Sequence, residues 1–589
     1  MKSPDLSAAA RRVAVSRAMM LLALVGLAGR AIHLTVIDDR GAQRGEAQTR
    51  RWLTLPPERG TIVDRNGAEF AISVRAPSIF ADSSQIEDIP RAAKLLAPIL
   101  ARDASDLEAR LRKRSSFQFL SRWISASQAE RVSALDLRGI GVLYEPRRVY
   151  PHKELAAQIL GFANIDAVGV RGIEQQEDAW LRGSVRRVRA ERDAHRDLLI
   201  SADTTPWSTA GGDVALTIDA ALQADAEASL REAAARTGAI GGFVISMDPY
   251  SGDILALAEL PGFDPNRFRH VDYASTRSRA FLDASEPGST LKAFLIAAAL
   301  ESGTITPDAR FDCENGAFRI RGRTIRDRKP YGSLTAIDIL RVSSNIGAAK
   351  IANALGRRAH HAMLKRFGFG EPTQSRFPGE SAGVLRPWRE WRPIDHATIA
   401  FGQGVSVTPI QLVAATAVFA NRGEWVRPRL VSARRAAGRS WQPVHRETVR
   451  RVLQPKTAAS VMAMLEEAVG PGGTGQAATL RGVRVAGKTG TAQKLDPATH
   501  RYSHDRFRAW FIGIVPADNP KLVILAGLDE PRPPTHTGGS AAAPLFAEVA
   551  AAQLSRLGIV TQPERVASRD LHRQGDLHRE GDPHHEGNG

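Results

Sequence analysis

Apolar positions near the start of the chain run almost without interruption. Uncharged residues fill 18–29, and the apolar run resumes after Arg30 through Ile37. Counted from Val13 to Ile37, the segment has 25 residues, enough to cross a bilayer if Arg17 and Arg30 extend toward the two interfaces. Basic residues before it favour a cytoplasmic side. The pattern predicts a basic tail over 1–17, a transmembrane anchor over 18–37 and the rest of the chain outside.

A cleaved signal peptide is the alternative, because a basic start followed by a short apolar run is also its signature. No clear A-x-A cleavage site follows the run, so a retained anchor is favoured. No second apolar stretch reaches spanning length, which predicts a single-pass chain.

Residues 40–235 mix short strand and helix patterns. A polar, basic linker over 40–58 is followed by a β-prone run and by Asn66-Gly67, a hairpin-turn signal. Apolar periodicity predicts helices within 86–140, namely Ala92–Leu111 and Ser127–Leu135. A strand over Asp213–Asp219 precedes a helix over Ala220–Ala235. We predict one mixed α/β module over 40–235.

The pattern changes near residue 236. Strands over 242–249 and Ile254–Ala258 flank the turn Ser251-Gly252-Asp253. Apolar helices and then late β-prone segments follow: Leu291–Leu300, Ala336–Leu355, Pro409–Ala420, Arg484–Ala486, Trp510–Val515 and Lys521–Leu528. Strands, helices and strands again predict an α+β domain over 236–560, with an antiparallel sheet packed by helices.

The last residues, 563–589, contain three copies of one polar hexapeptide, beginning at Asp570, Asp576 and Asp582. Such a tract buries too little apolar area to fold, so a disordered, His-rich tail is predicted. Its histidines could also bind a metal weakly.

Composition narrows the classes of partner. The net charge is +17, and the 80 basic residues are mostly arginines scattered along the chain, with only 6% aromatic residues. Nucleic-acid binding is therefore not favoured, whereas a surface near anionic lipid or an anionic polymer fits. The single cysteine, Cys313, excludes a disulfide within the chain and a multi-cysteine metal site.

The strongest candidate for chemistry is a serine–lysine pair. Of the twelve lysines, only Lys292 has a serine three positions earlier, Ser289, at the start of an apolar helix. Residues three apart share a helix face, so the lysine amine is expected beside the hydroxyl. A serine becomes a nucleophile when a nearby base takes its proton, and a desolvated lysine can act as that base. Alone, the motif is also an ordinary helix start.

Two further motifs follow in order. Ser343-Ser344-Asn345 precedes a stretch of small residues, and Lys488-Thr489-Gly490-Thr491 follows the β-prone run at Arg484–Ala486. Singly, they could be a helix cap and a strand edge. Their common order and wide separation are hard to obtain by chance, and they predict that three distant stretches converge on one groove.

The S-x-x-K, S-x-N and K-T-G trio resembles the active-serine penicillin-recognising enzymes. Its surroundings are similar to class B penicillin-binding proteins, most of all the division-specific peptidoglycan D,D-transpeptidase (FtsI) family. The resemblance covers roughly 18–555; its motifs are Arg59–Gly67, Gly169–Glu174, Met247-Asp248-Pro249, Phe263–Asn266, Glu286–Lys292, Phe377–Ser381, Gly402-Gln403-Gly404, Thr408–Gln411 and Lys488–Gln493. Elongation-specific relatives usually have Asp where Asn345 stands, which favours division. No segment resembles a class A glycosyltransferase domain.

The resemblance implies a role for each motif residue. Ser289 would attack the carbonyl between two terminal D-alanines, with Lys292 as general base. Ser343 would relay a proton to the departing D-alanine, and Asn345 would bind the substrate backbone. Lys488 would act on the proton network from the opposite side. Thr489 and Thr491 would bind the substrate's terminal carboxylate, and Gly490 between them would belong to the same substrate-binding motif. The backbone N–H groups of Ser289 and Thr491 would form the oxyanion hole.

The resemblance also implies an elongated pedestal, or dimerisation-type, module before the transpeptidase domain, and no metal or organic cofactor. Expected partners are D-Ala-D-Ala stem peptides, β-lactams, an FtsW-type glycan polymerase and other division proteins, with no nucleic acid. The expected location is the inner membrane at the septum, with the catalytic domain in the periplasm. The alternatives are an elongation-type transpeptidase, a D,D-carboxypeptidase or β-lactamase, and a non-catalytic scaffold.

Overall fold

The computed structural model describes residues 6–33, 50–55, 58–113, 115, 117–184, 186–192, 198–200, 210–495, 501–559 and 562–563. The chain divides into two compact units. One contains residues 1–57 and 184–210, and the other contains residues 58–183 and 211–589. The predicted tail over 563–589 lies, apart from Pro563, outside the described residues.

The first unit consists of one long helix and a small sheet. Helix α1 (Leu6–Ile32) contains a stretch, Arg11–Ile32, that is long and apolar enough to cross a membrane. The predicted anchor coincides with α1 as far as Ile32, and residues 34–37 lie outside the described residues. Strands β1 (Arg50–Leu55), β6 (Arg186–Arg192) and β7 (Leu198–Ile200) form an antiparallel sheet. Residues 50–55 were expected in a linker; they form a strand because they pair with a segment far along the chain, which local patterning does not reveal.

The second unit begins with a seven-stranded sheet of order β17-β16-β8-β2-β3-β4, with β5 paired to β3. Its strands are β2 (Ile62–Val63), β3 (Glu69–Ala81), β4 (Gln118–Ser121), β5 (Ile140–Val149), β8 (Asp213–Leu216), β16 (Val431–Arg435) and β17 (Gln442–Pro443). The predicted hairpin turn at Asn66-Gly67 is confirmed between β2 and β3. Asp64 Oδ1 closes it by accepting hydrogen bonds from the N–H groups of Asn66 (2.7 Å) and Ala68 (2.8 Å).

Three helices pack beside β3 and β4, namely α3 (Ile89–Leu100), α4 (Ala104–Leu111) and α5 (Ala126–Ser133). Their core contains Leu96, Leu107, Leu120 and Val132, all at most 3% exposed. The helix expected over Ser127–Leu135 is present as α5, but the one expected over Ala92–Leu111 is two helices, because Ala101 has φ +49° and Asp103 caps the start of α4. The stretch also contains strand β4, whose four residues are too few for an alternating pattern to stand out. Three short helices follow: α6 (Ala157–Leu160), α7 (Gly172–Gln176) and α8 (Asp178–Leu181).

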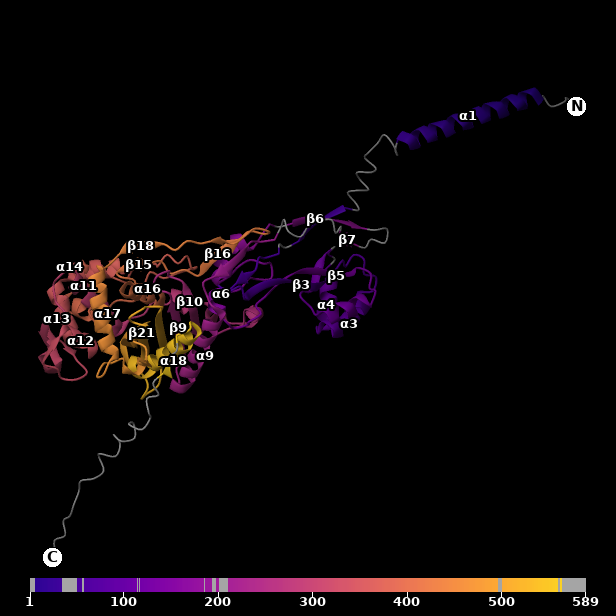
Figure 1. Ribbon diagram of the computed structural model, residues 1–589. Coiled ribbons are helices and arrows are strands. Elements are labelled where there is room, and N and C mark those ends of the chain that lie inside the picture. Colours follow the sequence, from indigo (N-terminus) through magenta and orange to yellow (C-terminus); the bar gives the residue numbers. More distant parts are fainter. Residues whose placement is uncertain are drawn as a thin grey trace, which may run out of the picture. The chain divides into compact units, whose positions relative to one another are not determined.

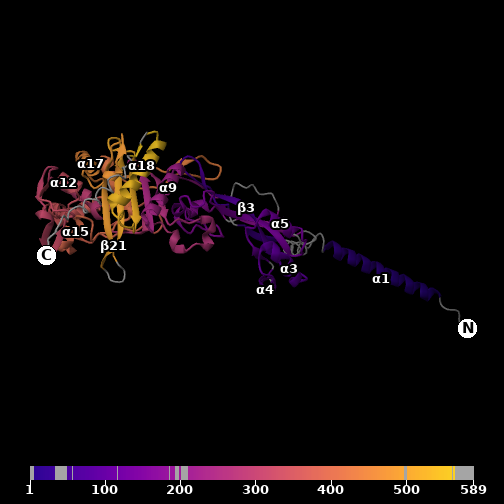
Figure 2. The same ribbon diagram turned by 90° about the horizontal axis from the view of Figure 1, so that it is seen from below.

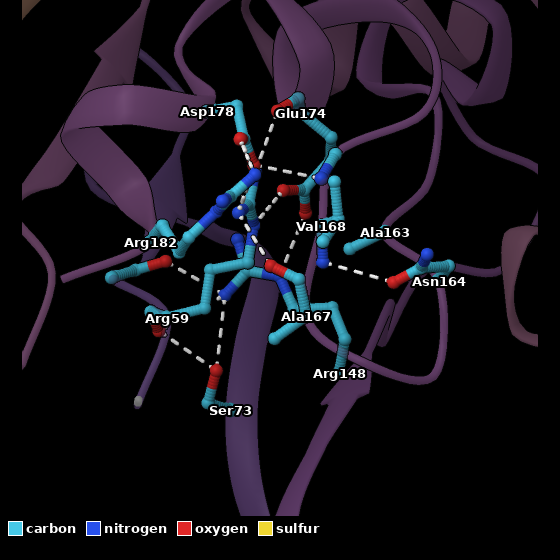
Figure 3. Close-up of polar contacts among 12 residues, drawn as sticks. Arg59, Ser73, Arg148, Ala163, Asn164, Ala167, Val168, Glu174, Asp178 and Arg182 are labelled. Carbon is cyan, nitrogen blue, oxygen red and sulfur yellow. Dashed lines mark hydrogen bonds and ion pairs between the residues drawn. The ribbon is translucent and has the colours of Figure 1, made fainter. Parts of the chain in front are cut away.

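A buried ionic cluster holds this part of the unit together (Figure 3). Glu174 on α7 is fully buried; it accepts hydrogen bonds from Arg59, Arg148 Nε (2.7 Å) and Tyr150 Oη (3.1 Å). The Arg59 guanidinium also reaches Asp178 at 2.7 Å. Burial alone would raise the pKa of the Glu174 carboxyl, but the charges and hydrogen bonds of both arginines outweigh burial and lower it. The cluster joins β5 to the helices that follow it.

The predicted antiparallel sheet packed by helices is confirmed in the C-terminal part. Its five strands have the order β10-β9-β22-β21-β20 and are all antiparallel. They are β9 (Gly241–Met247), β10 (Ile254–Leu260), β20 (Ala486–Leu495), β21 (Tyr502–Val515) and β22 (Leu522–Asp529). Figure 2 shows the magenta strands of the early hairpin beside the orange and yellow strands from the end of the chain.

Alternation along the strands divides the core in two. On β22, Ile524 and Leu528 pack with α9 (Ala220–Thr237) and α18 (Ala543–Arg556), whereas Val523 and Leu525 face the core that contains α11 (Leu291–Glu301) and α16 (Pro409–Ala420). This is the period of two expected for a sheet covered on both faces. Figure 1 labels these four helices around strands β9, β10 and β21 of the same sheet. The predicted domain boundary at 235/236 falls inside α9.

Helix α11 is apolar apart from Lys292 and Glu301 because other helices surround it. It contacts α13 (Asn345–Leu355), α14 (Arg357–Arg366) and α17 (Pro455–Val469), and its residues from Leu291 to Ala299 are all buried. The remaining elements are α10 (Arg279–Leu282), α12 (Ala336–Arg341), α15 (Pro393–Ile399), β11 (Arg310–Asp312), β12 (Ala317–Ile320), β13 (Arg323–Arg326), β14 (Ser333–Thr335), β15 (Glu424–Val426), β18 (Thr448–Arg451), β19 (Leu480–Arg481) and β23 (Gln562–Pro563).

Candidate active site

Ser289 lies in a tight 3-10 turn, η5 (Gly288–Thr290), immediately before α11. Gly288 has φ +56°, a left-handed conformation that glycine adopts without steric cost. Thr290 Oγ1 closes the turn by donating to the carbonyl of Pro287 at 2.8 Å. Ser289 is partly exposed, whereas Lys292, three residues later in the chain, is 0% exposed. The sequence therefore presents an accessible hydroxyl above a buried amine.

The loop Gly402-Gln403-Gly404 supports this turn from the side. Gly288 N–H donates to Gly402 O at 3.3 Å. A Cβ on Gly402 would lie 2.1 Å from the Gly288 carbonyl oxygen, so only glycine permits this approach. Glu286 ties the same loop down by accepting from the Gly404 N–H and from Tyr502 Oη, each at 2.8 Å.

The S-x-N motif interrupts what the pattern predicts as one helix over Ala336–Leu355. That prediction is wrong: α12 ends at Arg341 and α13 begins at Asn345. Ser343 has φ +63°, which no α-helix accommodates, and Ser344 Oγ caps α13 by accepting from Gly347 N–H at 2.9 Å. The break places Ser343 and Asn345 at the start of a helix next to α11.

The Lys292 amine contacts the residues between α12 and α13. Its Nζ donates to the Ser343 carbonyl (2.5 Å), to Ser343 Oγ (3.0 Å) and to Asn345 Oδ1 (2.8 Å). Within the described part of the chain no hydrogen bond joins Ser289 Oγ to either lysine of the motifs. The amine that was expected beside the Ser289 hydroxyl instead donates to Ser343 and Asn345, and Ser289 precedes Lys292 where η5 runs into α11. Ser289 Oγ itself makes no hydrogen bond with a described residue.

The pKa of the Lys292 amine lies well below its ordinary value. Burial is the main cause, the positive charge of Lys488 adds to it, and the carboxylate of Asp327 opposes it. A neutral amine has two N–H donors and one lone pair, so it can donate to two of these three oxygens while the Ser343 hydroxyl donates to the lone pair. The lowered pKa therefore moves Lys292 toward the form that can accept a proton.

Lys488 lies on β20 and is 1% exposed. Its Nζ donates to Thr489 Oγ1 and to Thr474 Oγ1, both at 3.2 Å. Burial lowers the pKa of Lys488 to about 7. Thr474 N–H donates to Arg341 O at 3.2 Å, so this threonine links the K-T-G strand to the end of α12. Sequence reasoning missed Thr474; its signal is the surrounding Gly472-Gly473-Thr474-Gly475 loop.

Strand β20 packs directly on the serine turn. A Cβ on Gly490 would lie 2.8 Å from the Pro287 carbonyl oxygen, and one on Gly288 would lie 2.9 Å from the Thr491 carbonyl oxygen. Thr491 is exposed, and its Oγ1 accepts from Gly538 N–H at 3.0 Å. β20 is the edge of its sheet among the described strands, so backbone groups on one side of it have no strand partner.

Asp327 is a second residue that sequence reasoning missed. It follows β13, and its carboxylate accepts from Ser344 Oγ (2.6 Å), Asn345 N–H (2.5 Å) and Ile346 N–H (3.1 Å). It thus fixes the first turn of α13 and sets the position of Asn345. Because it lies between a hairpin and a loop, far from the S-x-N motif in the chain, no local pattern marks it.

The three motifs therefore meet at one place: Ser289 on its turn, Ser343 and Asn345 at the start of α13, and Thr489–Thr491 on an edge strand. Two buried lysines lie beneath them. No group of three or more acidic, histidine or cysteine side chains suited to a metal occurs among the described residues.

Comparison with known proteins identifies this arrangement. Residues 242–551 match the penicillin-binding protein transpeptidase domain, and residues 54–216 match the penicillin-binding protein dimerisation domain. The chain therefore belongs to the class B penicillin-binding proteins, a family of peptidoglycan D,D-transpeptidases.

Individual relatives agree over most of their length. The probable peptidoglycan D,D-transpeptidase PenA of Neisseria meningitidis is 34% identical, with 92% of this chain and 93% of PenA covered. The peptidoglycan D,D-transpeptidase FtsI of Escherichia coli K12 is 31% identical over 95% of this chain and 94% of FtsI. Among solved structures, penicillin-binding protein 3 of Mycobacterium tuberculosis complexed with aztreonam is 27% identical, with a TM-score of 0.67, covering 87% of this chain and 98% of that chain.

The depressed pKa of Lys488 predicts a pH-dependent stability. A lysine with a pKa of about 7 when folded and 10.5 when unfolded binds fewer protons in the folded state between these values. Stability therefore rises with pH across that window, by at most about 1.4 kcal/mol per pH unit. Denaturant unfolding from pH 7 to pH 9 should show this rise in the wild type and a smaller rise in Lys488→Met. Parallel curves would contradict the depressed pKa.

Proposed function

We propose that the chain cross-links peptidoglycan stem peptides through an acyl-enzyme on Ser289. The observation that carries the proposal is the pairing of a free, accessible Ser289 hydroxyl with a fully buried Lys292 on the same turn, packed against an edge strand. Buried lysine supplies the base, and the edge strand supplies backbone groups for an extended peptide.

In the proposed acylation, Ser289 Oγ attacks the carbonyl carbon between the two terminal D-alanines, and its proton passes to the neutral Lys292 amine. The carbonyl oxygen becomes an oxyanion, stabilised by the backbone N–H groups of Ser289 and Thr491. As the C–N bond breaks, the proton travels from Lys292 through Ser343 Oγ to the departing D-alanine nitrogen. The 3.0 Å contact between Lys292 Nζ and Ser343 Oγ supports this relay.

In the second half, an amine from a neighbouring stem peptide attacks the acyl-enzyme ester. The new amide bond forms, the amine loses a proton through Lys292, and Ser289 Oγ recovers its proton as it leaves. Asn345 would hold the donor peptide backbone, and Thr489, Gly490 and Thr491 would hold its terminal carboxylate near the charge of Lys488. No cofactor enters this sequence, since the ester conserves the energy of the broken peptide bond.

A transferase is favoured over a hydrolase by the surroundings of Ser289. Glu286, the acid nearest to it along the chain, accepts from Gly404 N–H and Tyr502 Oη through Oε1, which fixes the carboxylate against the neighbouring loop, while Oε2 has no partner among the described residues. In the described part of the chain, no carboxylate hydrogen-bonds Ser289 Oγ. A water attacking the ester would have Lys292 as a base but no added carboxylate to activate it, so the acyl-enzyme should persist until an amine arrives.

Labelling with a fluorescent penicillin tests the proposal. Stable label that is absent from Ser289→Ala is expected, because β-lactams mimic the D-Ala-D-Ala terminus. Rapid loss of the label would instead indicate a carboxypeptidase or a β-lactamase. The absence of any label on folded wild-type protein would indicate that the protein is a non-catalytic scaffold.

We further propose that the chain acts at the division septum, anchored in the inner membrane by α1 with residues after the anchor in the periplasm. Similarity to FtsI, Asn345 in the S-x-N motif and the basic residues before the apolar stretch support this location. An FtsW-type glycan polymerase and other division proteins are the proposed partners. A fluorescent fusion should gather at midcell in dividing cells; distribution along the lateral wall would favour an elongation role.

Asp327 gives a prediction about how Asn345 is positioned. Asp327→Ala removes the acceptor for two N–H groups and for Ser344, and should lower the free energy of unfolding by about 1–2 kcal/mol. Penicillin acylation should slow by about 10-fold, because Asn345 and Ser343 lose their fixed geometry. Stopped-flow acylation and denaturant unfolding measure the two effects. Asp312→Ala, which removes only an exposed 2.9 Å contact to Glu314 N–H, is the control; equal effects in both variants would refute the positioning role.

A further inference from the structure

A cavity far from the serine turn in the chain is lined almost entirely by cations and aromatic rings. It encloses about 190 Å³ where the end of β4, the end of β5 and the 3-10 helix η3 (Pro265–His270) meet. Five arginines line it: Arg122, Arg147, Arg148, Arg267 and Arg269. No acidic residue is among its described lining residues.

Among the described residues, acidic partners are found for two of these arginines. Arg122 pairs with Glu145 and, at 3.3 Å, with Asp166, and Arg148 pairs with Glu174 at 2.7 Å. The guanidinium groups of Arg147, Arg267 and Arg269 form no ion pair or hydrogen bond with any described residue. Three positive charges around this cavity are therefore uncompensated.

Three guanidinium groups lie close to the indole ring of Trp123. The guanidinium carbons of Arg122, Arg147 and Arg269 lie 5.7, 5.9 and 5.2 Å from its ring centroid. Trp123 has φ +59°, a strained conformation for a bulky residue. Arg122 is paired with acidic side chains, so two of the three cations around this ring, Arg147 and Arg269, have no counter-ion among the described residues. An anion bound beside the ring would be attracted by both.

Two buried donors at the cavity also have no partner. They are Trp123 Nε1 and Arg148 Nη2, and Arg148 as a whole is only 8% exposed. The other nitrogens of Arg148 are engaged, Nε with Glu174 and Nη1 with Gly60 O at 2.7 Å. A buried donor without an acceptor is costly, so unpaired donors beside uncompensated cations indicate a ligand with several acceptor oxygens.

We propose that this cavity binds a diphosphate group. Three uncompensated guanidinium groups match its multiple negative charge better than the single charge of a carboxylate. The donors also come from three segments of the chain, which suits tetrahedral phosphate oxygens better than a planar group. The site is separate from the serine chemistry and does not depend on it.

Calorimetric titration of the full-length, detergent-solubilised protein with inorganic diphosphate at low ionic strength tests the site. The wild type should bind, and R267Q/R269Q should bind at least about 10-fold more weakly, because two charge-assisted contacts are lost. Both residues are exposed, so folding should survive, as the thermal midpoint without ligand will show. The matched control is R357Q/R389Q, which removes two arginines stacked on Trp388 outside the cavity; it should bind like the wild type.

No binding to the wild type, or equal binding to R267Q/R269Q, would overturn the proposal. Equally tight binding of glutarate would overturn the preference for phosphate. Titration with geranyl diphosphate then tests whether the bound diphosphate is a lipid ester or the free anion. Binding as tight as that of the inorganic ion means that the site accepts a diphosphate esterified to a lipid, whereas binding of the inorganic ion alone means that it accepts the free anion.

Discussion

Replacing Lys292 by alanine is expected to slow penicillin acylation at least about 100-fold, the usual worth of a general base. The Ser289 hydroxyl stays in place, but its proton has no acceptor on the same helical turn. The two contacts from Nζ to Ser343 Oγ and Asn345 Oδ1 are lost as well, which also removes the relay. Stopped-flow measurement of acylation gives the rate.

Lys350→Ala is the matched control for this variant. Lys350 lies on α13 and pairs with Glu314 at 2.7 Å, outside the serine turn. Its removal should leave the acylation rate unchanged. Wild-type rates in Lys292→Ala, with the fold intact by circular dichroism, would exclude this lysine as the base.

Replacing Glu174 by alanine is expected to lower the free energy of unfolding by about 3–5 kcal/mol. Glu174 is fully buried between Arg59 and Arg148, so its loss leaves two buried guanidinium groups without their shared counter-ion (Figure 3). Denaturant unfolding measures the change. Glu108→Ala removes an exposed ion pair with Arg112 and should cost at most about 0.5 kcal/mol. Similar losses in the two variants would show that the buried cluster is not a stabilising element.

The same cluster should respond to acid. The pKa of Glu174 is lowered from 4.5, so its charge stabilises the fold at pH values above 4.5, and that contribution is lost as the pH falls through the folded-state pKa. The difference in stability between the wild type and Glu174→Gln should therefore narrow below pH 4.5.

Strong periodic patterns allowed much of the fold to be predicted. The hairpin over β9 and β10, helices α11 and α16 and the turn at Asn66-Gly67 all carry local signals that the structure bears out. Pairings between distant segments could not be foreseen, such as β1 with β6, because they depend on residues far apart in the chain. The helix expected over Ala336–Leu355 failed for another reason: a left-handed Ser343 overrides the helical pattern on either side of it.

The candidate site divides in the same way. Its eight predicted residues lie on three motifs that the structure brings together. They could be predicted because each motif is a short, continuous stretch of the sequence. Asp327 and Thr474 were missed because each acts through residues outside its own segment, Asp327 at the start of α13 and Thr474 at Lys488. The cationic cavity was missed as well: its arginines come from three stretches and look like ordinary surface charge in the sequence.

Mass spectrometry of the penicillin-treated protein tests the central claim most directly. After proteolysis, the added mass of one opened β-lactam should lie on the peptide that contains Ser289, and fragmentation should place it on that residue. An adduct on Ser343, on another nucleophile, or on no residue of a folded protein would contradict the proposed acyl-enzyme.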